Sequence, residues 1–152
     1  MYSTITETKE GAILAEKQYK IGEFAALVGL STYTLRYYEE QGLIKPQRDP
    51  AGLRYYTLAD VKWVGFILHL KGTGMRINEL QNYVKLRAQG DSTIEARKAL
   101  LQQVKARAEA EVAELQANLA IMGRKIDWYD GKLDHSIDQS ESFETYLQRF
   151  ES

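Results

Sequence analysis

A proline-free stretch of about 40 residues, from Thr93 to Leu133, most constrains how this chain can fold, and its only glycines are Gly123 and Gly131. Apolar side chains recur through it in steps of three and four, with a mean of about 3.6 residues. This spacing predicts one continuous helix, about 60 Å long, with a narrow apolar stripe of the coiled-coil kind. The stripe consists of Leu101, Val104, Ala108, Val112, Leu115, Leu119, Met122 and Ile126, and it continues through Tyr129 and Leu133.

Such a stripe needs a partner that runs beside it. Residues 19–90 form too small a domain to cover a helix of this length, and the chain has no second long helix. We therefore expect a homodimer in which two copies pair their long helices along residues 91–133. The alternative is a long helix that packs within a helical bundle.

The front of the chain predicts two short helices, at 21–28 and 33–41, joined by a tight turn at Gly29. In the first helix, apolar residues recur at i, i+3, i+4 and i+7. In the second, Leu35 and Tyr38 face inward, and the opposite face is aromatic and basic. Two such helices form a helix-turn-helix pattern. The outward face of the second helix carries Tyr33, Arg36 and Tyr37.

A β-hairpin wing is expected next, because turn-forming residues between 46 and 52 precede an aromatic strand at 53–56. Arg48 and Arg54 flank the turn. Tyr56 is expected to pack first, with its hydroxyl available to a phosphate. Helices follow at about 58–71, which is apolar on most faces and is predicted to be the buried centre of the domain, and at about 76–88.

These side chains predict a site for double-stranded DNA. Arginine makes bidentate contacts to guanine or holds phosphate, and tyrosine hydroxyls reach phosphates or bases. Wing arginines can contact the backbone or enter a minor groove. Together on a winged helix-turn-helix, these residues are far more specific than any one of them alone. The predicted contacts are Tyr33, Arg36, Tyr37, Arg48, Arg54 and Tyr56.

The net charge of -1 argues against DNA binding only when it is averaged over the chain. Residues 19–90 carry ten basic and six acidic side chains, whereas residues 91–152 carry eight basic and twelve acidic ones. A basic front and an acidic back fit a polyanion-binding domain followed by a different module. An offset of this size also arises by chance, so both interpretations stay open.

Several chemistries are excluded by composition. The chain has no cysteine and two histidines, His69 and His135, which excludes thiol chemistry and makes an imidazole zinc site improbable. We expect no metal, no cofactor, no membrane span and no signal peptide, and therefore a cytoplasmic protein. Residues 1–18 are expected to be a disordered extension. Residues 134–152 are expected to form either a small amphipathic helix or a frayed tail.

The segments YKIGEFA (19–25), STYTLRYYEEQGLIKP (31–46), RDPAGLRYY (48–56) and GTGMRINEL (72–80) resemble the N-terminal signature of the MerR family of transcriptional regulators. The resemblance covers about residues 19–133. The segments GDSTIEARKALL (90–101) and KIDWY (125–129) are most similar to the branch associated with aldehyde and other electrophile stress. Ala51 and Leu53 depart from the asparagine and the aromatic residue that the family often has in its wing.

The resemblance implies a homodimer with an antiparallel coiled coil. Such a protein bends and untwists promoter DNA between the -35 and -10 elements, so that RNA polymerase can engage both. By position, it implies DNA contacts from Arg36 and Tyr37 on the recognition helix and from Arg54, Tyr56 and Arg48 on the wing.

The resemblance also raises the question of a sensor. Since cysteine is absent, a small-molecule effector would have to bind non-covalently, and too few residues follow the coil for a drug-binding domain. Two other classes of protein fit the sequence less well: an excisionase-like architectural factor, against which the long helix argues, and an enzyme, for which no catalytic motif is present. The candidate walls of an effector pocket are Trp63, Phe66, Tyr83 and Trp128, for which plain core packing is the alternative.

Overall fold

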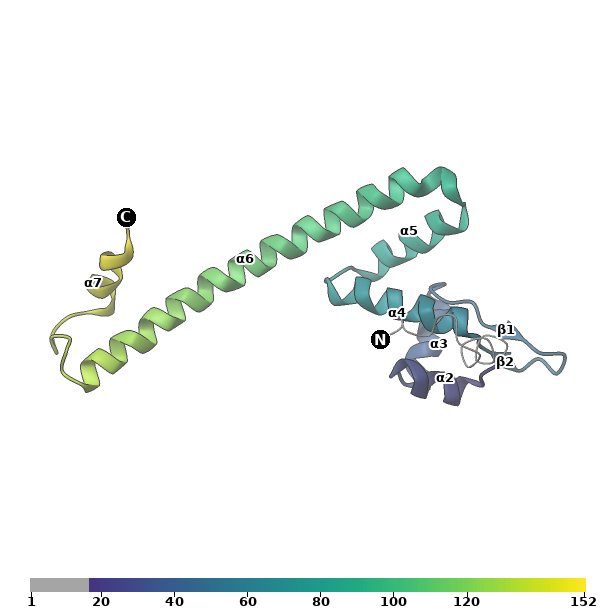
Figure 1. Ribbon diagram of the computed structural model, residues 1–152, viewed down its shortest axis with the longest axis horizontal. Helices are drawn as coiled ribbons and strands as arrows, with labels where there is room; N and C mark the ends of the chain where they lie inside the picture. Colours follow the sequence, from purple (N-terminus) through teal and green to yellow (C-terminus); the bar gives the residue numbers. More distant parts are fainter. Residues whose placement is uncertain (1–16) are drawn as a thin grey trace, which may run out of the picture. The chain divides into compact units, whose positions relative to one another are not determined.

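The computed structural model describes residues 17–152, which form two compact units divided between Lys105 and Ala106 (Figure 1). This division lies inside the longest helix and not at residue 90, where the sequence placed it. The first unit contains α2 (Ile21–Val28), α3 (Thr32–Glu40), β1 (Gln47–Arg48), β2 (Arg54–Tyr55), α4 (Leu58–Gly72), α5 (Ile77–Ala88) and a 3-10 turn, Asp91–Thr93. Helix α6 (Ile94–Leu133) starts there and continues into the second unit, which also contains α7 (Phe143–Leu147) and a 3-10 turn, Gln148–Phe150.

The predicted fold class, mainly helical with a winged helix-turn-helix and one long helix, is confirmed. The expectation of disorder over residues 1–18 falls almost entirely outside the described residues.

Local capping chemistry explains where the first helices begin and end. Gly29 has a φ of 71° and ends α2 in the left-handed conformation, which glycine adopts without a steric penalty. The Ser31 hydroxyl accepts a hydrogen bond from the Thr34 N–H at 3.1 Å and so caps α3. At the start of α4, the Asp60 carboxylate accepts from the Thr57 N–H at 2.8 Å, as the capping pattern in the sequence predicted.

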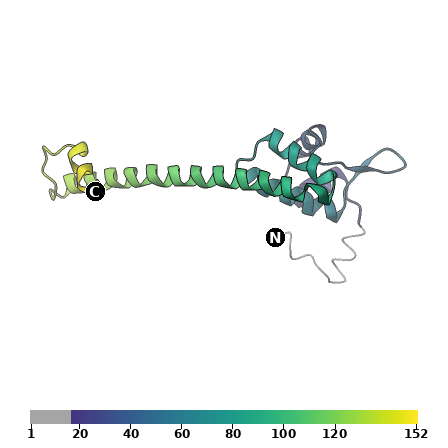
Figure 2. The same ribbon diagram turned by 90° about the horizontal axis from the view of Figure 1, so that it is seen from above.

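The core of the first unit surrounds α4, whose Val64 and Ile67 are fully buried. The Phe24 ring from α2 stacks on Tyr56 at 4.2 Å with the two planes parallel. Tyr19 and Tyr56 exchange a pair of backbone hydrogen bonds of 2.8 Å, which holds the base of the wing to the segment before α2. The helix-turn-helix and the wing therefore share one core, and the hairpin projects from it (Figure 2).

The first turns of α6 belong to this core as well. The Thr93 hydroxyl, which is buried, lies 2.6 Å from the Leu86 carbonyl oxygen and donates to it. Arg97 Nε donates to the Thr93 hydroxyl oxygen at 3.1 Å. Two turns beyond Arg97, Val104 is only 2% exposed and lies within the core cluster.

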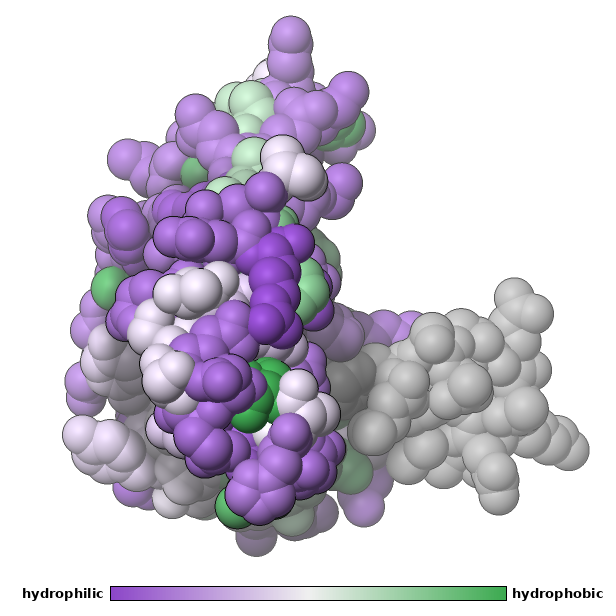
Figure 3. Space-filling view, turned by 90° about the vertical axis from the view of Figure 1, so that its left-hand side faces the viewer, coloured by the Kyte–Doolittle hydropathy of each residue, from purple (hydrophilic) through white to green (hydrophobic). Residues whose placement is uncertain are grey.

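The second unit is built on the C-terminal part of α6, with α7 beside it (Figure 2). Ile137 and Tyr146 are buried there, and the Phe143 ring meets Trp128 edge-on at 5.8 Å. The Arg124 guanidinium lies 3.6 Å above the Phe150 ring. Residues 143–147 are thus a packed helix and not a frayed tail. The face shown in Figure 3 is mostly hydrophilic, with apolar side chains in small separate areas.

Candidate nucleic-acid interface

Helix α3 separates its side chains as its sequence predicted. Leu35 and Tyr38 are 0% and 2% exposed and pack into the core. Tyr33 is 79% exposed, Tyr37 is 40% exposed, and Arg36 is exposed beside them. This outward face presents one cation and two phenol hydroxyls, which suit contacts to base edges and phosphates.

The wing is a two-stranded antiparallel hairpin in which Gln47 pairs with Tyr55 and Arg48 with Arg54. Its turn is closed by Asp49, whose carboxylate accepts from the Leu53 N–H at 2.9 Å. Gly52 has a φ of 81°, a conformation that a side chain would strain. The predicted hairpin is confirmed, although each strand has only two residues.

Glu39 on α3 joins the recognition helix to the wing. Its Oε2 atom lies 2.7 Å from Arg54 Nε, and its Oε1 atom lies 3.6 Å from a terminal nitrogen of Arg48. The Glu39 side chain is 25% exposed, against 34% for Arg54 and 49% for Arg48. Sequence reasoning missed this residue, because Glu39 lies 15 positions before Arg54 and no local spacing connects them.

Tyr56 differs from the other predicted contacts, because it does not reach the surface of the wing. It is 1% exposed, and its hydroxyl is enclosed and has no hydrogen-bond partner among the described residues. Burial, with a smaller contribution from Glu39, raises the pKa of Tyr56, so its hydroxyl keeps its proton. The expected packing role is the one seen here; a phosphate contact would require the hydroxyl to become accessible.

A hollow of ≈ 380 Å³ lies where the wing, α3 and the start of α2 meet. Arg36 and Arg54 both line it, together with Lys20. These residues come from three different segments of the chain, so only the fold brings them together. Their shared positive charge suits a phosphate, although Asp49 also lines this hollow.

The stripe of α6 is divided between the two units. In the second unit its side chains remain open to solvent, from Val112 at 54% exposed to Leu133 at 79%. In the first unit Val104 is buried and Leu101 packs against the core. The assignment of Val104 to a dimer contact is therefore corrected, because its own chain already covers it; Leu101 is partly covered in the same way.

No group of three or more potential metal-ligating side chains occurs among residues 17–152. Over the same range, none of the helices is both long and apolar enough to cross a membrane.

A family model for MerR helix-turn-helix regulatory proteins matches residues 19–102. An uncharacterized HTH-type transcriptional regulator of Haemophilus influenzae is 32% identical over 112 residues, which span 73% of this chain and 83% of that protein. The chain belongs to the MerR family. It is a DNA-binding transcriptional regulator.

Solved structures extend the similarity along this MerR-family chain. HiNmlR, a MerR family regulator lacking the sensor domain and crystallised with promoter DNA, is 30% identical with a TM-score of 0.68; the match covers 78% of this chain and 94% of that one. A MerR family regulator from Listeria monocytogenes is also 30% identical, with a TM-score of 0.71, and the match covers 87% of this chain and 96% of that one.

The four aromatic residues predicted to wall an effector pocket fall into two groups. Trp63, Phe66 and Tyr83 touch one another in the first unit, with ring centroids 5.7–6.5 Å apart. The Arg87 guanidinium lies 4.2 Å above the Trp63 ring. Trp128 belongs to the second unit, where it packs against Tyr129 and Phe143.

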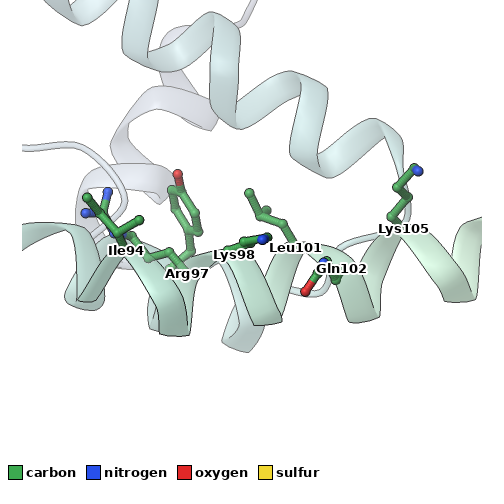
Figure 4. Close-up of a pocket in the computed structure, with 7 residues that line it drawn as sticks. Ile94, Arg97, Lys98, Leu101, Gln102 and Lys105 are labelled. Carbon is green, nitrogen blue, oxygen red and sulfur yellow. The ribbon is translucent and has the colours of Figure 1, made fainter. Parts of the chain in front are cut away.

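Next to Tyr83, a groove of ≈ 350 Å³ follows the first turns of α6 (Figure 4). Ile94 and Lys105 lie at its two ends, with Leu101 between them. Arg97 and Lys98 add positive charge to its border. Tyr83 is the one predicted pocket residue that lines this groove, and an effector bound there stays a prediction.

Proposed function

We propose that this MerR-family regulator binds promoter DNA as a homodimer and distorts the duplex between the -35 and -10 elements. Recognition helix α3 would enter the major groove with Arg36 and Tyr37, and Tyr33 would contact it at the exposed start of the helix. The wing would place an arginine, Arg54, on the DNA backbone. RNA polymerase would respond indirectly, through the changed geometry of the promoter.

One observation carries the DNA-binding part of the proposal: Arg36 on the outward face of α3 and Arg54 on the wing line the same hollow. Support also comes from HiNmlR, a 30% identical protein whose structure contains promoter DNA. We also propose that the protein distorts the DNA that it binds and that it acts in the cytoplasm.

The dimer is proposed because the stripe of α6 beyond residue 105 is apolar yet open to solvent. Val112, Leu115, Leu119, Met122 and Ile126 are each more than half exposed. An apolar row of this length on a water-exposed helix is typical of a coiled-coil surface that a second helix covers. A small-molecule effector, if one acts, would bind without forming a bond to a thiol, because the chain has no cysteine.

Footprinting on the DNA upstream of its own gene tests the site and the spacer length together. On that DNA, Arg36→Ala should weaken binding by about 1–3 kcal/mol at fixed salt, because it removes one base or phosphate contact. Lys85→Ala is the matched control: it removes one exposed positive charge from α5 and should leave the affinity nearly unchanged. Equal affinities for both variants and the wild type would refute the assignment of α3.

A circular-permutation bending assay on the same fragment tests the distortion. We expect the complex to migrate according to the position of the site in the fragment. Position-independent migration, together with an intact footprint, would leave a DNA-binding protein that does not act by bending the promoter.

A further inference from the structure

The two wing arginines use their nitrogens differently. Arg54 meets Glu39 through Nε, at 2.7 Å, and the structure gives its two terminal nitrogens no partner among the described residues. Arg48 uses both terminal nitrogens: one donates to the Gly52 carbonyl oxygen at 3.0 Å, and the other lies 3.6 Å from Glu39. Only Arg54 therefore keeps the outer edge of its guanidinium open.

An open outer edge has a chemical meaning. The two terminal nitrogens of a guanidinium carry parallel N–H groups that fit two oxygens of one phosphate. A carboxylate that holds Nε fixes the plane of the group without occupying that edge. Glu39 is thus positioned to aim Arg54 while leaving its phosphate-binding edge free.

The hollow beside α3 separates the two arginines in the same way. Arg54 lines it together with Arg36 and Lys20, and Arg48 is not among its lining residues. Asp49 also lines the hollow, and its carboxylate accepts from the Leu53 N–H of the wing turn. A phosphate in this hollow would meet cations from α3 and from the wing at once.

We propose that Glu39 is a positioning residue that aims Arg54 at one phosphate of the DNA backbone, while Arg48 shapes the wing turn and contacts no phosphate. This inference rests on the proposed function, since it assumes that the surface around α3 binds DNA. It assigns different roles to two arginines that the sequence treats as equivalent.

The direction in which Glu39→Gln changes the affinity for DNA separates this proposal from simple electrostatics. If Glu39 acts only as a negative charge near DNA, then Glu39→Gln removes repulsion and tightens binding. If Glu39 aims Arg54, the same substitution releases the arginine and weakens binding, despite the more favourable net charge. We expect binding to be about five-fold weaker, as is common when two contacting residues are uncoupled.

Glu40→Gln is the matched control, because Glu40 is the exposed neighbour on α3 and loses the same charge. It should bind the footprinted fragment as tightly as the wild type or more tightly. Arg54→Ala should reduce the slope of log affinity against log salt by about 0.9, which is the value for one lost phosphate contact. Arg48→Ala should weaken binding with the salt slope unchanged.

A double substitution distinguishes the positioning role of Glu39 from a purely structural one. In the Arg54→Ala background, Glu39 has no Arg54 to aim, so adding Glu39→Gln should tighten binding instead of weakening it. Far-ultraviolet circular dichroism on every variant checks that α3 is intact. If Glu39→Gln tightens binding in both backgrounds, or if Arg48→Ala rather than Arg54→Ala changes the salt slope, the proposal is overturned.

These failures differ from a failure of the proposed function. If the wild type leaves no footprint and Arg36→Ala changes nothing, then DNA binding by this surface is wrong. If the wild type binds and Arg36→Ala weakens it while Glu39→Gln behaves like Glu40→Gln, only the positioning role of Glu39 is lost.

Discussion

The apolar stripe of α6 has different surroundings in the two units, although steps of three and four residues run through both. In the first unit, Val104 is 2% exposed, because it packs into a core shared with α4 and α5. In the second unit, Leu115 and Met122 are 59% and 60% exposed. Periodicity therefore identifies the face of a helix that has to be buried, but not the group that buries it.

The C-terminal segment does not cover the exposed part of the stripe. It packs on a different face of α6, where Arg124 lies against Phe150, Trp128 against Phe143 and Gly131 against Ile137. On α6, positions 124, 128 and 131 are four and three residues apart. They alternate with the stripe residues Met122, Ile126, Tyr129 and Leu133. The second unit thus has a small core of its own and leaves the stripe available to a second copy.

The largest expected effect is at Val104. Val104→Lys places an unpaired charge in the core of the first unit and should lower its free energy of unfolding by about 3–5 kcal/mol. Denaturant unfolding followed by Trp63 fluorescence, in a Trp128→Phe background, measures it. Gln103→Lys, on the exposed side of the same turn, should change stability by less than about 0.5 kcal/mol. Equal losses for both variants would show that Val104 is not a core residue.

Leu115→Lys should weaken the dimer and not the fold of the first unit, because Leu115 lies on the exposed part of the stripe. We expect the dimer dissociation constant to rise about a hundred-fold or more, since each copy would bury a lysine against the other. The unfolding of the first unit should not change. Sedimentation velocity over a concentration series provides the measurement, and Gln116→Lys is the control. A dimer that persists in Leu115→Lys would exclude the stripe as the dimer contact.

The smallest effects are expected at two glycines of α6. A Cβ atom on Gly131 would lie 2.5 Å from Ile137 Cγ1 and closer still to Cδ1, whereas one on Gly123 would meet nothing within 4 Å. Gly131→Ala should therefore destabilise the packing of the C-terminal segment by about 1–3 kcal/mol. Gly123→Ala should stabilise the helix by about 0.5–1 kcal/mol. Hydrogen exchange of the amides at 134–150 follows both, and slower exchange in Gly131→Ala would contradict the contact with Ile137.

The recognition helix could be predicted well because its information is local. Ser31 caps α3, Gly29 ends α2, and the three-to-four spacing places Leu35 inside and Arg36 outside. Each of these signals acts within about one helical turn. The starts of α3 and α6 therefore fall within one residue of their predicted positions, Tyr33 and Thr93.

The relations across the first unit could not be predicted in this way. Glu39 and Arg54 are brought together only when the hairpin folds back on α3. The sequence predicts that Tyr56 packs, but not that its ring stacks on Phe24 of α2, 32 positions earlier in the chain. Such contacts depend on how separate segments pack, which no spacing within one segment records.

By itself, the sequence determined the helices, the wing, the outward face of α3 and the length of α6, because caps, turn residues and periodicity act over a few positions. It also determined that no thiol chemistry takes part, since cysteine is absent. Only the tertiary structure decided which half of the stripe is core and which half is open. It alone decided that Arg54 keeps a free edge and Arg48 does not, because burial and pairing depend on residues that are distant in the chain and meet only in the fold.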